Sequence, residues 1–335
     1  MLDRMKILVT GGAGFIGSHL CERLLRERHE LTVVDDLNDF YPPAAKQANL
    51  EAVRRSGSFE FHRADISDEA RMVEVFRQSR PEAVVHLAAR AGVRPSLEQP
   101  ILYARVNVLG STILLEASRR FGVRKFVFAS SSSIYGNGNR LPFREDDSLN
   151  LPVSPYAATK IAGEKIAYTY SHLYGLQTVC LRFFTVYGPR QRPDLAIRKF
   201  ATMIDRGQPI PLFGDGSSSR DYTYIDDTIQ GVVAALAYDC SYEVFNLGRS
   251  EPIRLTDLVR TLEAAMGKKA AIQWMPDQPG DVSTTYADIS KARDAFRYQP
   301  RIGFRAGIDR FLSWFFSSEN TQAAVRAVGA EPAEG

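Results

Sequence analysis

Two residues in the middle of the chain, Tyr156 and Lys160, have the types and the spacing of an acid–base pair. Side chains four residues apart lie on one face of a helix, so the phenol has a cation beside it. A tyrosine with its ordinary pKa of about 10 is a poor base at pH 7, and a nearby positive charge favours the phenolate. Lowering that pKa to about 7 requires about 4 kcal/mol, more than one lysine is expected to supply. The pair therefore predicts a tyrosine base that works beside a second fixed cation.

A glycine-rich turn near the N-terminus indicates where that second cation binds. The apolar run 6–10 is typical of a buried parallel strand, and Gly11-Gly12-Ala13-Gly14-Phe15-Ile16-Gly17 follows it, ahead of an amphipathic helix. In this context glycines permit a tight turn, close approach of the backbone to a pyrophosphate and close packing of helix on strand. Free N–H groups at the helix N-terminus favour the same anion. The segment therefore predicts a dinucleotide site, with its glycines spaced GxxGxxG rather than GxGxxG.

The next strand, residues 31–34, ends at Asp35. A carboxylate at this point suits the ribose hydroxyls of NAD and repels the extra phosphate of NADP. We therefore predict NAD as the cofactor, with its oxidised nicotinamide ring as the second cation. The contacts expected from these segments are Gly11, Gly14, Phe15, Ile16, Gly17 and Asp35.

The composition of the 335 residues is that of an ordinary globular enzyme, with 44% hydrophobic and 24% charged residues. The formal charge of +3 comes without a basic tract, so we expect no nucleic-acid partner. Three cysteines without metal spacing fit a reducing cytoplasm and predict no metal site. No run reaches about 18 apolar residues and no secretory signal opens the chain, so we expect a cytoplasmic protein without a membrane segment.

Strand-like runs alternate with helical stretches through the first half of the chain. The strand-like runs are residues 31–34, 59–62, 83–87, 125–129 and 178–182, and the helical stretches are 68–79, 100–121 and 155–174. This alternation predicts an α/β fold with a doubly wound parallel sheet of the Rossmann type. Ligands in such sheets bind beyond the carboxyl ends of the strands. Polar or small residues follow predicted strands at Asp65, Ala88, Ser130–Ser133 and Thr185, so we expect the chemistry there.

Glycine, proline and serine break this rhythm after residue 188, and helical stretches follow at 194–206, 255–266 and 303–316. We predict an NAD-binding domain over 1–188 with return segments near 225–247, a smaller mixed α/β substrate-binding domain over most of 189–316, and a disordered tail over 317–335.

An ordered set of segments resembles the extended short-chain dehydrogenase/reductase family, and within it the NAD-dependent nucleotide-sugar epimerases. The set comprises the glycine turn, Asp65-Ile66, His86-Leu87-Ala88-Ala89, Asn107, the serine run leading to Tyr135-Gly136, Tyr156/Lys160 and Arg220-Asp221-Tyr222. Residues 89–94, 185–194 and 278–282 look most like UDP-glucuronate 4-epimerases. The resemblance covers about residues 5–316.

This resemblance implies a mechanism. Ionised Tyr156 takes the proton of the sugar 4-hydroxyl while C4 gives its hydride to a tightly bound NAD. The 4-keto sugar turns over in the site, and hydride returns to its opposite face, so NAD is regenerated in each cycle. Lys160 would bind the nicotinamide ribose and depress the Tyr156 pKa, and Ser131 would orient the 4-hydroxyl and relay its proton.

The resemblance also implies further contacts. The cofactor contacts are Asp65, Ile66, Leu87, Ala88, Ala89, Asn107, Tyr156 and Lys160. The substrate contacts are Arg94, Ser131, Ser132, Ser133, Tyr156, Thr185, Arg192, Arg220, Gln278 and Asp281, with Ser132 also placed among the catalytic residues. Asp65 has an alternative role as a helix cap, and Arg90 is expected to face solvent. The family's helix-bundle dimers imply a homodimer through the helices near 100–121 and 155–174.

Sugar choice depends on Thr185 and Arg192. Enzymes of this family that act on neutral hexoses commonly have asparagine at the Thr185 position, and the planar fork of an arginine matches a carboxylate. We therefore expect the pair to bind the C6 carboxylate of a UDP-hexuronic acid, so that UDP-glucuronate is converted to UDP-galacturonate.

Three alternatives remain. They are a UDP-glucose/UDP-galactose 4-epimerase, a UDP-glucuronate decarboxylase, and a non-catalytic NAD-binding sensor. Serine at positions 132 and 133, where dehydratases of the family have an acidic pair and decarboxylases typically a glutamate, disfavours elimination and decarboxylation.

Overall fold

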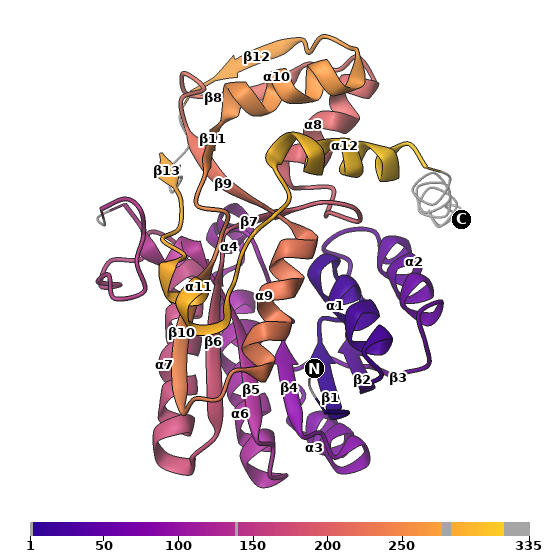
Figure 1. The fold of residues 1–335 in the computed structure, drawn as a ribbon, viewed down its shortest axis with the longest axis vertical. Helices are drawn as coiled ribbons and strands as arrows, with labels where there is room; N and C mark the ends of the chain where they lie inside the picture. Colours follow the sequence, from indigo (N-terminus) through magenta and orange to yellow (C-terminus); the bar gives the residue numbers. More distant parts are fainter. Residues whose placement is uncertain (1–2, 138–139, 277–282, 318–335) are drawn as a thin grey trace.

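The computed structural model describes residues 3–137, 140–276 and 283–317. Its centre is a seven-stranded, entirely parallel sheet in the order β10-β6-β5-β4-β1-β2-β3 (Figure 1). In that order the strands are Tyr242–Leu247, Gln177–Phe183, Lys125–Ser131, Ala83–His86, Lys6–Thr10, Glu30–Asp35 and Glu60–Arg63. Strand order reverses between β1 and β4, which is where such sheets bind ligands. The predicted doubly wound fold is confirmed.

Helices cover both faces of this sheet over two separate hydrophobic clusters. One face carries α1 (Phe15–Arg26), α2 (Pro43–Arg54) and α9 (Ile225–Ala237), whose apolar residues pack with the first cluster. The other carries α3 (Glu69–Ser79), α6 (Ser111–Arg120) and α7 (Pro155–Tyr174). The strands are buried on both sides because neither face is left to solvent.

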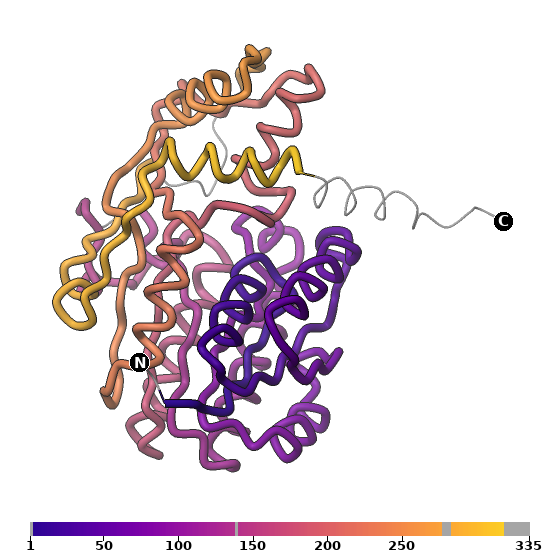
Figure 2. The backbone as a smooth tube through the Cα atoms, turned by 45° about the vertical axis from the view of Figure 1, so that its right-hand side comes forward, coloured from indigo at the N-terminus to yellow at the C-terminus, as the bar shows by residue number. Residues whose placement is uncertain are grey.

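A smaller part sits beyond the carboxyl ends of the large sheet (Figures 1 and 2). Its strands are β7 (Thr185–Tyr187), β8 (Ile210–Phe213), β9 (Ser219–Tyr224), β11 (Pro252–Arg254), β12 (Ile272–Met275) and β13 (Thr284–Thr285). Its helices are α8 (Ala196–Asp205), α10 (Leu255–Met266) and α12 (Phe304–Phe315), while α11 (Ser290–Phe296) packs against β10. Residues 225–247 return to the large sheet as α9 and β10, as Figure 2 traces. The predicted domain limits themselves stay a prediction.

The predicted helix near 100–121 is confirmed, and its middle is a π-helix. Residues of this stretch form α5 (Pro100–Tyr103), the π-helix η1 (Ala104–Gly110) and then α6, after a short α4 (Val93–Glu98). Side-chain hydroxyls of Ser111 and Thr112 donate to the carbonyls of Asn107 and Val108, four residues earlier. Such bonds compete with the regular backbone ladder, and hydrophobic periodicity alone carries no sign of the change.

Helix α7 carries Tyr156 and Lys160, and its position is fixed at its start and in its middle. The Ser154 hydroxyl caps its N-terminus by accepting from the Ala157 N–H at 3.1 Å. One turn beyond Lys160, Glu164 accepts two hydrogen bonds, of 3.0 and 2.9 Å, from Arg182 on β6. Both side chains are only 2–3% exposed, so this ion pair ties α7 to the sheet.

Glu164→Gln should destabilise the protein by about 3–5 kcal/mol, because it leaves the Arg182 charge buried and unpaired. Urea unfolding at fixed protein concentration measures this loss. The matched control is Asp309→Asn on α12, which breaks a solvent-exposed pair with Arg305 and should cost less than about 1 kcal/mol. Equal losses in the two variants would contradict a structural role for the buried pair.

None of the helices in the described ranges is long and apolar enough to cross a membrane.

Candidate active site

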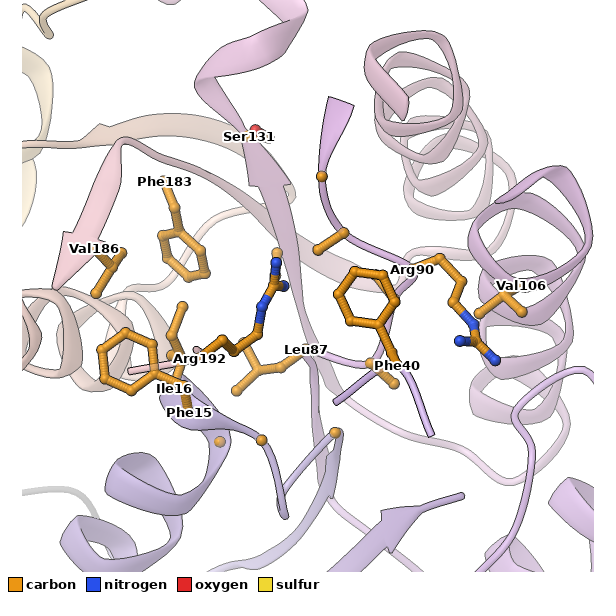
Figure 3. Close-up of a pocket in the computed structure, with 18 of the residues that line it drawn as sticks. Phe15, Ile16, Phe40, Leu87, Arg90, Val106, Ser131, Phe183, Val186 and Arg192 are labelled. Atoms are coloured by element: carbon orange, nitrogen blue, oxygen red, sulfur yellow. The ribbon is translucent and has the colours of Figure 1, made fainter. Parts of the chain in front are cut away.

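A cavity of about 380 Å³ opens at the carboxyl ends of the central strands (Figure 3). Its wall brings together residues that are up to about 180 positions apart in the sequence. From the predicted set, the lining residues are Gly11, Gly14, Phe15, Ile16, Gly17, Asp35, Asp65, Ile66, Leu87, Ala88, Ala89, Ser131, Ser132, Ser133, Tyr156, Lys160, Thr185 and Arg192. The sheet topology thus assembles one site from most of the predicted residues.

The glycine turn forms a cradle that side chains would fill. Gly11 has a φ of +72°, and a Cβ there would lie 2.7 Å from the Ala88 nitrogen. A Cβ on Gly17 would lie 2.1 Å from the Gly11 carbonyl oxygen. Because α1 begins at Phe15, its free N–H groups point out of this turn. The turn fits the pyrophosphate of a dinucleotide.

Asp35 stands at the β2 end of the cavity and is 7% exposed. Its two oxygens accept hydrogen bonds from the Ala13 and Leu37 N–H groups, at 3.1 and 2.9 Å. Burial raises the pKa of this carboxyl, and the nearby Lys46 ammonium acts against that rise. The anchored carboxylate keeps lone pairs for ribose hydroxyls, so the NAD prediction fits this end of the site.

Tyr156 and Lys160 meet the cavity at the β5 end. Ser131, the last residue of β5, hydrogen-bonds to the Tyr156 phenol, and the Tyr103 ring packs edge-on against it with centroids 6.2 Å apart. Lys160 donates to the Ala129 carbonyl oxygen at 2.7 Å, with its Nζ 5.1 Å from the Phe128 ring centroid. Phenol, hydroxyl and ammonium therefore line one corner.

The electrostatics of this corner add a charge that the sequence did not indicate. Burial raises the pKa of Tyr156, while the hydrogen bond from Ser131 and the charge of Arg192 lower it. The Arg192 charge thus acts on Tyr156, while the Lys160 ammonium donates to the Ala129 carbonyl. The predicted effect of Lys160 on the Tyr156 pKa stays a prediction. Burial lowers the pKa of Lys160 to about 8, and the Glu164 carboxylate opposes this shift.

The serine run changes from strand to 3₁₀-helix at Ser131. The Ser131 hydroxyl caps η2 (Ser132–Tyr135) by accepting from the Ser133 N–H at 3.2 Å. Ser130 also lines the cavity, and its buried hydroxyl has no hydrogen-bond partner among the described residues. An orphaned hydroxyl here is a contact available to a ligand.

Arg192 enters the cavity from the segment after β7. Figure 3 shows its guanidinium reaching in between Phe183 and Phe40. Nε and Nη2 donate to the Asp194 carboxylate at 3.0 and 2.6 Å. Thr185, at the start of β7, lines the same cavity, so the predicted carboxylate pair shares one space with Tyr156.

A second pocket of about 200 Å³ contains the other predicted arginines. Arg94 and Arg220 line it together with Lys199, Phe213 and Tyr222. The Arg94 guanidinium lies 4.7 Å from the Phe213 ring centroid. This mixture of cations and aromatic rings suits a nucleoside diphosphate.

Asn107 is not among the residues that line either pocket. Its amide holds the Arg90 backbone, accepting from the N–H at 2.8 Å and donating to the carbonyl at 3.0 Å, and it donates to Thr159. Arg90 itself lines the cavity and donates to Asn38 at 3.4 Å, so its expected solvent-facing position is wrong. Asn107 thus shapes the site through its neighbours, and a direct cofactor contact stays a prediction.

Asp65 lines the cavity while binding Ser67 and Arg105. The cap of α3 is Asp68, which accepts from the Arg71 N–H, so the alternative role of Asp65 is wrong. The adenine contact stays a prediction. Gln278, Asp281 and the predicted tail from 318 onward lie outside the described residues.

Sequence reasoning missed several lining residues. Phe40, Tyr41 and Lys46 come from the connection after β2 and the start of α2, and Leu195 precedes α8. Phe40, Tyr41 and Lys46 could have been suspected because they follow Asp35 closely in the sequence. Nothing in their residue types marked them as site residues.

Because folding lowers the Lys160 pKa, the buried charge destabilises the protein at pH 7, and this penalty disappears as the pH rises through about 8 toward 10.5. Compared with Lys160→Met, the wild type should gain about 2–3 kcal/mol of unfolding free energy between pH 7 and pH 10. Urea unfolding across this range is the measurement. Lys165→Met, an exposed position of the same helix, should follow the wild type at every pH. If the unfolding free energies of the wild type and of Lys160→Met changed in parallel with pH, the buried charge would be refuted.

Comparison with known proteins agrees with this geometry. The UDP-glucuronate 4-epimerase of Thermodesulfobacterium geofontis is 44% identical over 316 residues, which cover 94% of this chain and 97% of that protein. The UDP-glucuronic acid 4-epimerase of Bacillus cereus, solved with UDP-glucuronic acid and NAD, is 37% identical with a TM-score of 0.87, covering 92% and 98%. The UDP-glucose 4-epimerase of Thermotoga maritima, solved with UDP-glucose, is 33% identical with a TM-score of 0.86, covering 93% and 98%.

The model of the NAD dependent epimerase/dehydratase family matches residues 7–248, which include the glycine turn, the serine run and the Tyr156/Lys160 pair. This chain belongs to that family.

Proposed function

We propose that this protein inverts C4 of UDP-glucuronate to give UDP-galacturonate, with NAD as a tightly held cofactor that is regenerated in each cycle. The observation that carries the proposal is one cavity in which the Arg192 guanidinium faces the same space as Tyr156, Lys160 and Ser131. With an acid–base pair on one side and a carboxylate-binding cation on the other, the cavity suits a hexuronate bound between them.

The cofactor residues are already arranged. The glycine turn and the N-terminus of α1 would hold the pyrophosphate, Asp35 the adenosine ribose, and Lys160 with Ser130 the nicotinamide end. When bound, NAD supplies a reversible hydride acceptor for C4 of the sugar. Between the Asp35 end and the Lys160 end of the cavity, the wall is formed by the apolar Phe15, Ile16 and Leu87 side chains, which exclude water.

Tyr156 moves the proton. Its hydrogen bond with Ser131 places both oxygens where a sugar 4-hydroxyl can join them, so the proton reaches the phenolate directly or through Ser131. On the return step the phenol gives the proton back to the 4-oxygen. Because Arg192 and Ser131 both favour the phenolate, the site opposes the effect of burial on this base.

The cavity does not favour elimination. The carboxylates among its described lining residues are Asp35, which ends β2, Asp36, which follows it, and Asp65, which comes after β3. Tyr156 lies at the opposite end, beside β5. Without an acidic group next to the sugar C5, the chemistry stops at reversible oxidation of C4, which favours epimerisation over dehydration.

The second pocket supports a UDP-linked sugar. Arg94, Lys199 and Arg220 provide positive charge for a diphosphate, and Phe213 offers a ring face for a base. Asp194 lines this pocket while its carboxylate binds Arg192 of the first cavity. The pockets therefore adjoin, as a nucleotide and its sugar require.

A homodimer and a cytoplasmic location complete the proposal. Exposed apolar side chains gather on α4 to α7, including Leu97, Ile101, Leu109, Tyr168 and Leu173. Apolar surface at this density is typical of an interface between protomers. Cys21, Cys180 and Cys240 carry no disulfide, as a reducing compartment favours.

Incubating the purified enzyme with UDP-glucuronate without added NAD, and following products by NMR and mass spectrometry, tests the function. We expect inversion at C4 without CO₂ release. Tyr156→Phe should lower kcat by about 10²–10⁴-fold, because the base is lost. Inversion of UDP-glucose alone would favour the neutral-sugar epimerase, CO₂ release the decarboxylase, and the absence of any sugar-dependent change in NADH absorbance a sensor.

Arg192→Ala tests the uronate preference. It should raise the KM for UDP-glucuronate by about tenfold to a hundredfold, because hydrogen bonds to a charged group are lost. The kcat/KM ratio of UDP-glucuronate to UDP-glucose should fall by a similar factor. Arg305→Ala, at an exposed arginine of α12, is the control. An unchanged ratio in the Arg192→Ala enzyme would remove Arg192 from sugar selection.

A further inference from the structure

We propose that Phe40 is a positioning residue for uronate selection. Its ring packs on the face of the Arg192 guanidinium, while Asp194 binds one edge of the same guanidinium. This inference rests on the proposed function and extends it from the cation that binds the sugar carboxylate to the residues that hold this cation. Phe40 belongs to the connection after β2, on the cofactor side of the cavity, and was not among the residues predicted from the sequence.

The contacts of Arg192 leave one edge of its guanidinium for a ligand. Asp194 takes Nε and one proton of Nη2, at 3.0 and 2.6 Å. The guanidinium carbon lies 5.1 Å from the centroid of the Phe40 ring. The edge formed by Nη1 and the second Nη2 proton has no partner among the described residues. It is the edge that a second carboxylate would bind with two parallel hydrogen bonds.

An aromatic ring suits this task better than another hydrogen-bond acceptor would. A ring attracts the cation through its face and uses none of the five N–H donors. It also restricts the rotation of a long side chain that would otherwise sample many conformers. Phe40 and Asp194 together therefore fix the plane of the fork, so that a C6 carboxylate meets it preformed. A neutral hydroxymethyl group gains little from the same arrangement.

The segment that presents Phe40 is itself held by local hydrogen bonds. The Asp36 carboxylate accepts from the backbone and side-chain N–H groups of Asn38, at 3.0 and 2.6 Å. The Asn38 amide oxygen then accepts from the Phe40 N–H at 3.1 Å. Because Asp35 immediately precedes this turn, one short connection serves both the proposed NAD ribose site and the sugar-selecting cation.

The test uses Phe40→Leu, which keeps an apolar side chain of similar size but removes the ring face. The full-length enzyme should show a KM for UDP-glucuronate about tenfold higher, with kcat changed less than KM. The kcat/KM ratio of UDP-glucuronate to UDP-glucose should fall by a similar factor. Phe40→Tyr, which retains the ring, should restore this ratio. A general packing defect would lower kcat/KM equally for both substrates, and this result would overturn the proposal.

A double-mutant cycle separates this proposal from the proposed function. If Phe40 acts through Arg192, adding Phe40→Leu to Arg192→Ala should leave the substrate ratio where the single Arg192→Ala variant puts it. A further fall would mean that Phe40 acts on its own, and the positioning role would be wrong. A Phe40→Leu effect on a ratio that Arg192→Ala does not change would likewise overturn it. The failure of Arg192→Ala alone to change the ratio would count against the uronate assignment itself.

The cofactor content of each variant is the remaining readout, because Phe40 lines the cavity proposed for NAD. Absorbance and chromatography of NAD released from denatured enzyme should give equal occupancy in wild type and Phe40→Leu. NAD loss that accounts for the kinetic change would assign Phe40 to cofactor binding and refute its role beside Arg192.

Discussion

The buried ion pair between Glu164 and Arg182 is the constraint on which the active site depends. It connects the helix that carries Tyr156 and Lys160 to the middle of the sheet, and removing either partner leaves a charge in an apolar interior. Tyr156, Lys160 and Glu164 recur every four residues along one face of α7. The two hydrogen bonds that hold Glu164 therefore also fix the direction in which Tyr156 and Lys160 point. Arg182 extends the connection to the Tyr135 hydroxyl at 2.9 Å, so the end of the serine segment is held to the same pair.

The opposite wall of the cavity depends on short connections after strands. Arg192 follows β7, and Phe40 follows β2, although these strands belong to different sheets. Their contact joins the smaller part of the molecule to the loop beside Asp35. On the proposed function, substrate selection and cofactor binding are therefore not separate properties of two parts of the chain. They share residues at the boundary between them, which is where α/β sheets of this topology bind ligands.

The sequence was informative where residue types and local spacing carry the chemistry. Tyr156/Lys160 needs only helical periodicity, and the glycine turn needs only its flanking strand and helix, so both were predictable. The alternation of strands and helices gave the sheet for the same reason. The partners of Arg192 and Glu164 were not predictable, because they depend on how distant segments pack. Phe40 and Arg182 are an ordinary aromatic residue and an ordinary strand residue until the fold places them beside a charge.

The charges around Tyr156 limit where its basicity can come from. Burial raises the pKa of Tyr156 and so disfavours the phenolate, and Lys160 donates a short hydrogen bond to the Ala129 carbonyl. Arg192 favours the phenolate, yet Asp194 already balances part of its charge, and a uronate carboxylate on its free edge would balance more. On the proposed role of Arg192, its charge therefore favours the phenolate less once the acid is bound. An oxidised cofactor would add positive charge to that of Lys160, so Tyr156 would become a better base when the hydride acceptor is in place. Proton and hydride transfer would then be coupled by electrostatics, because the same oxidised ring accepts the hydride and favours the phenolate.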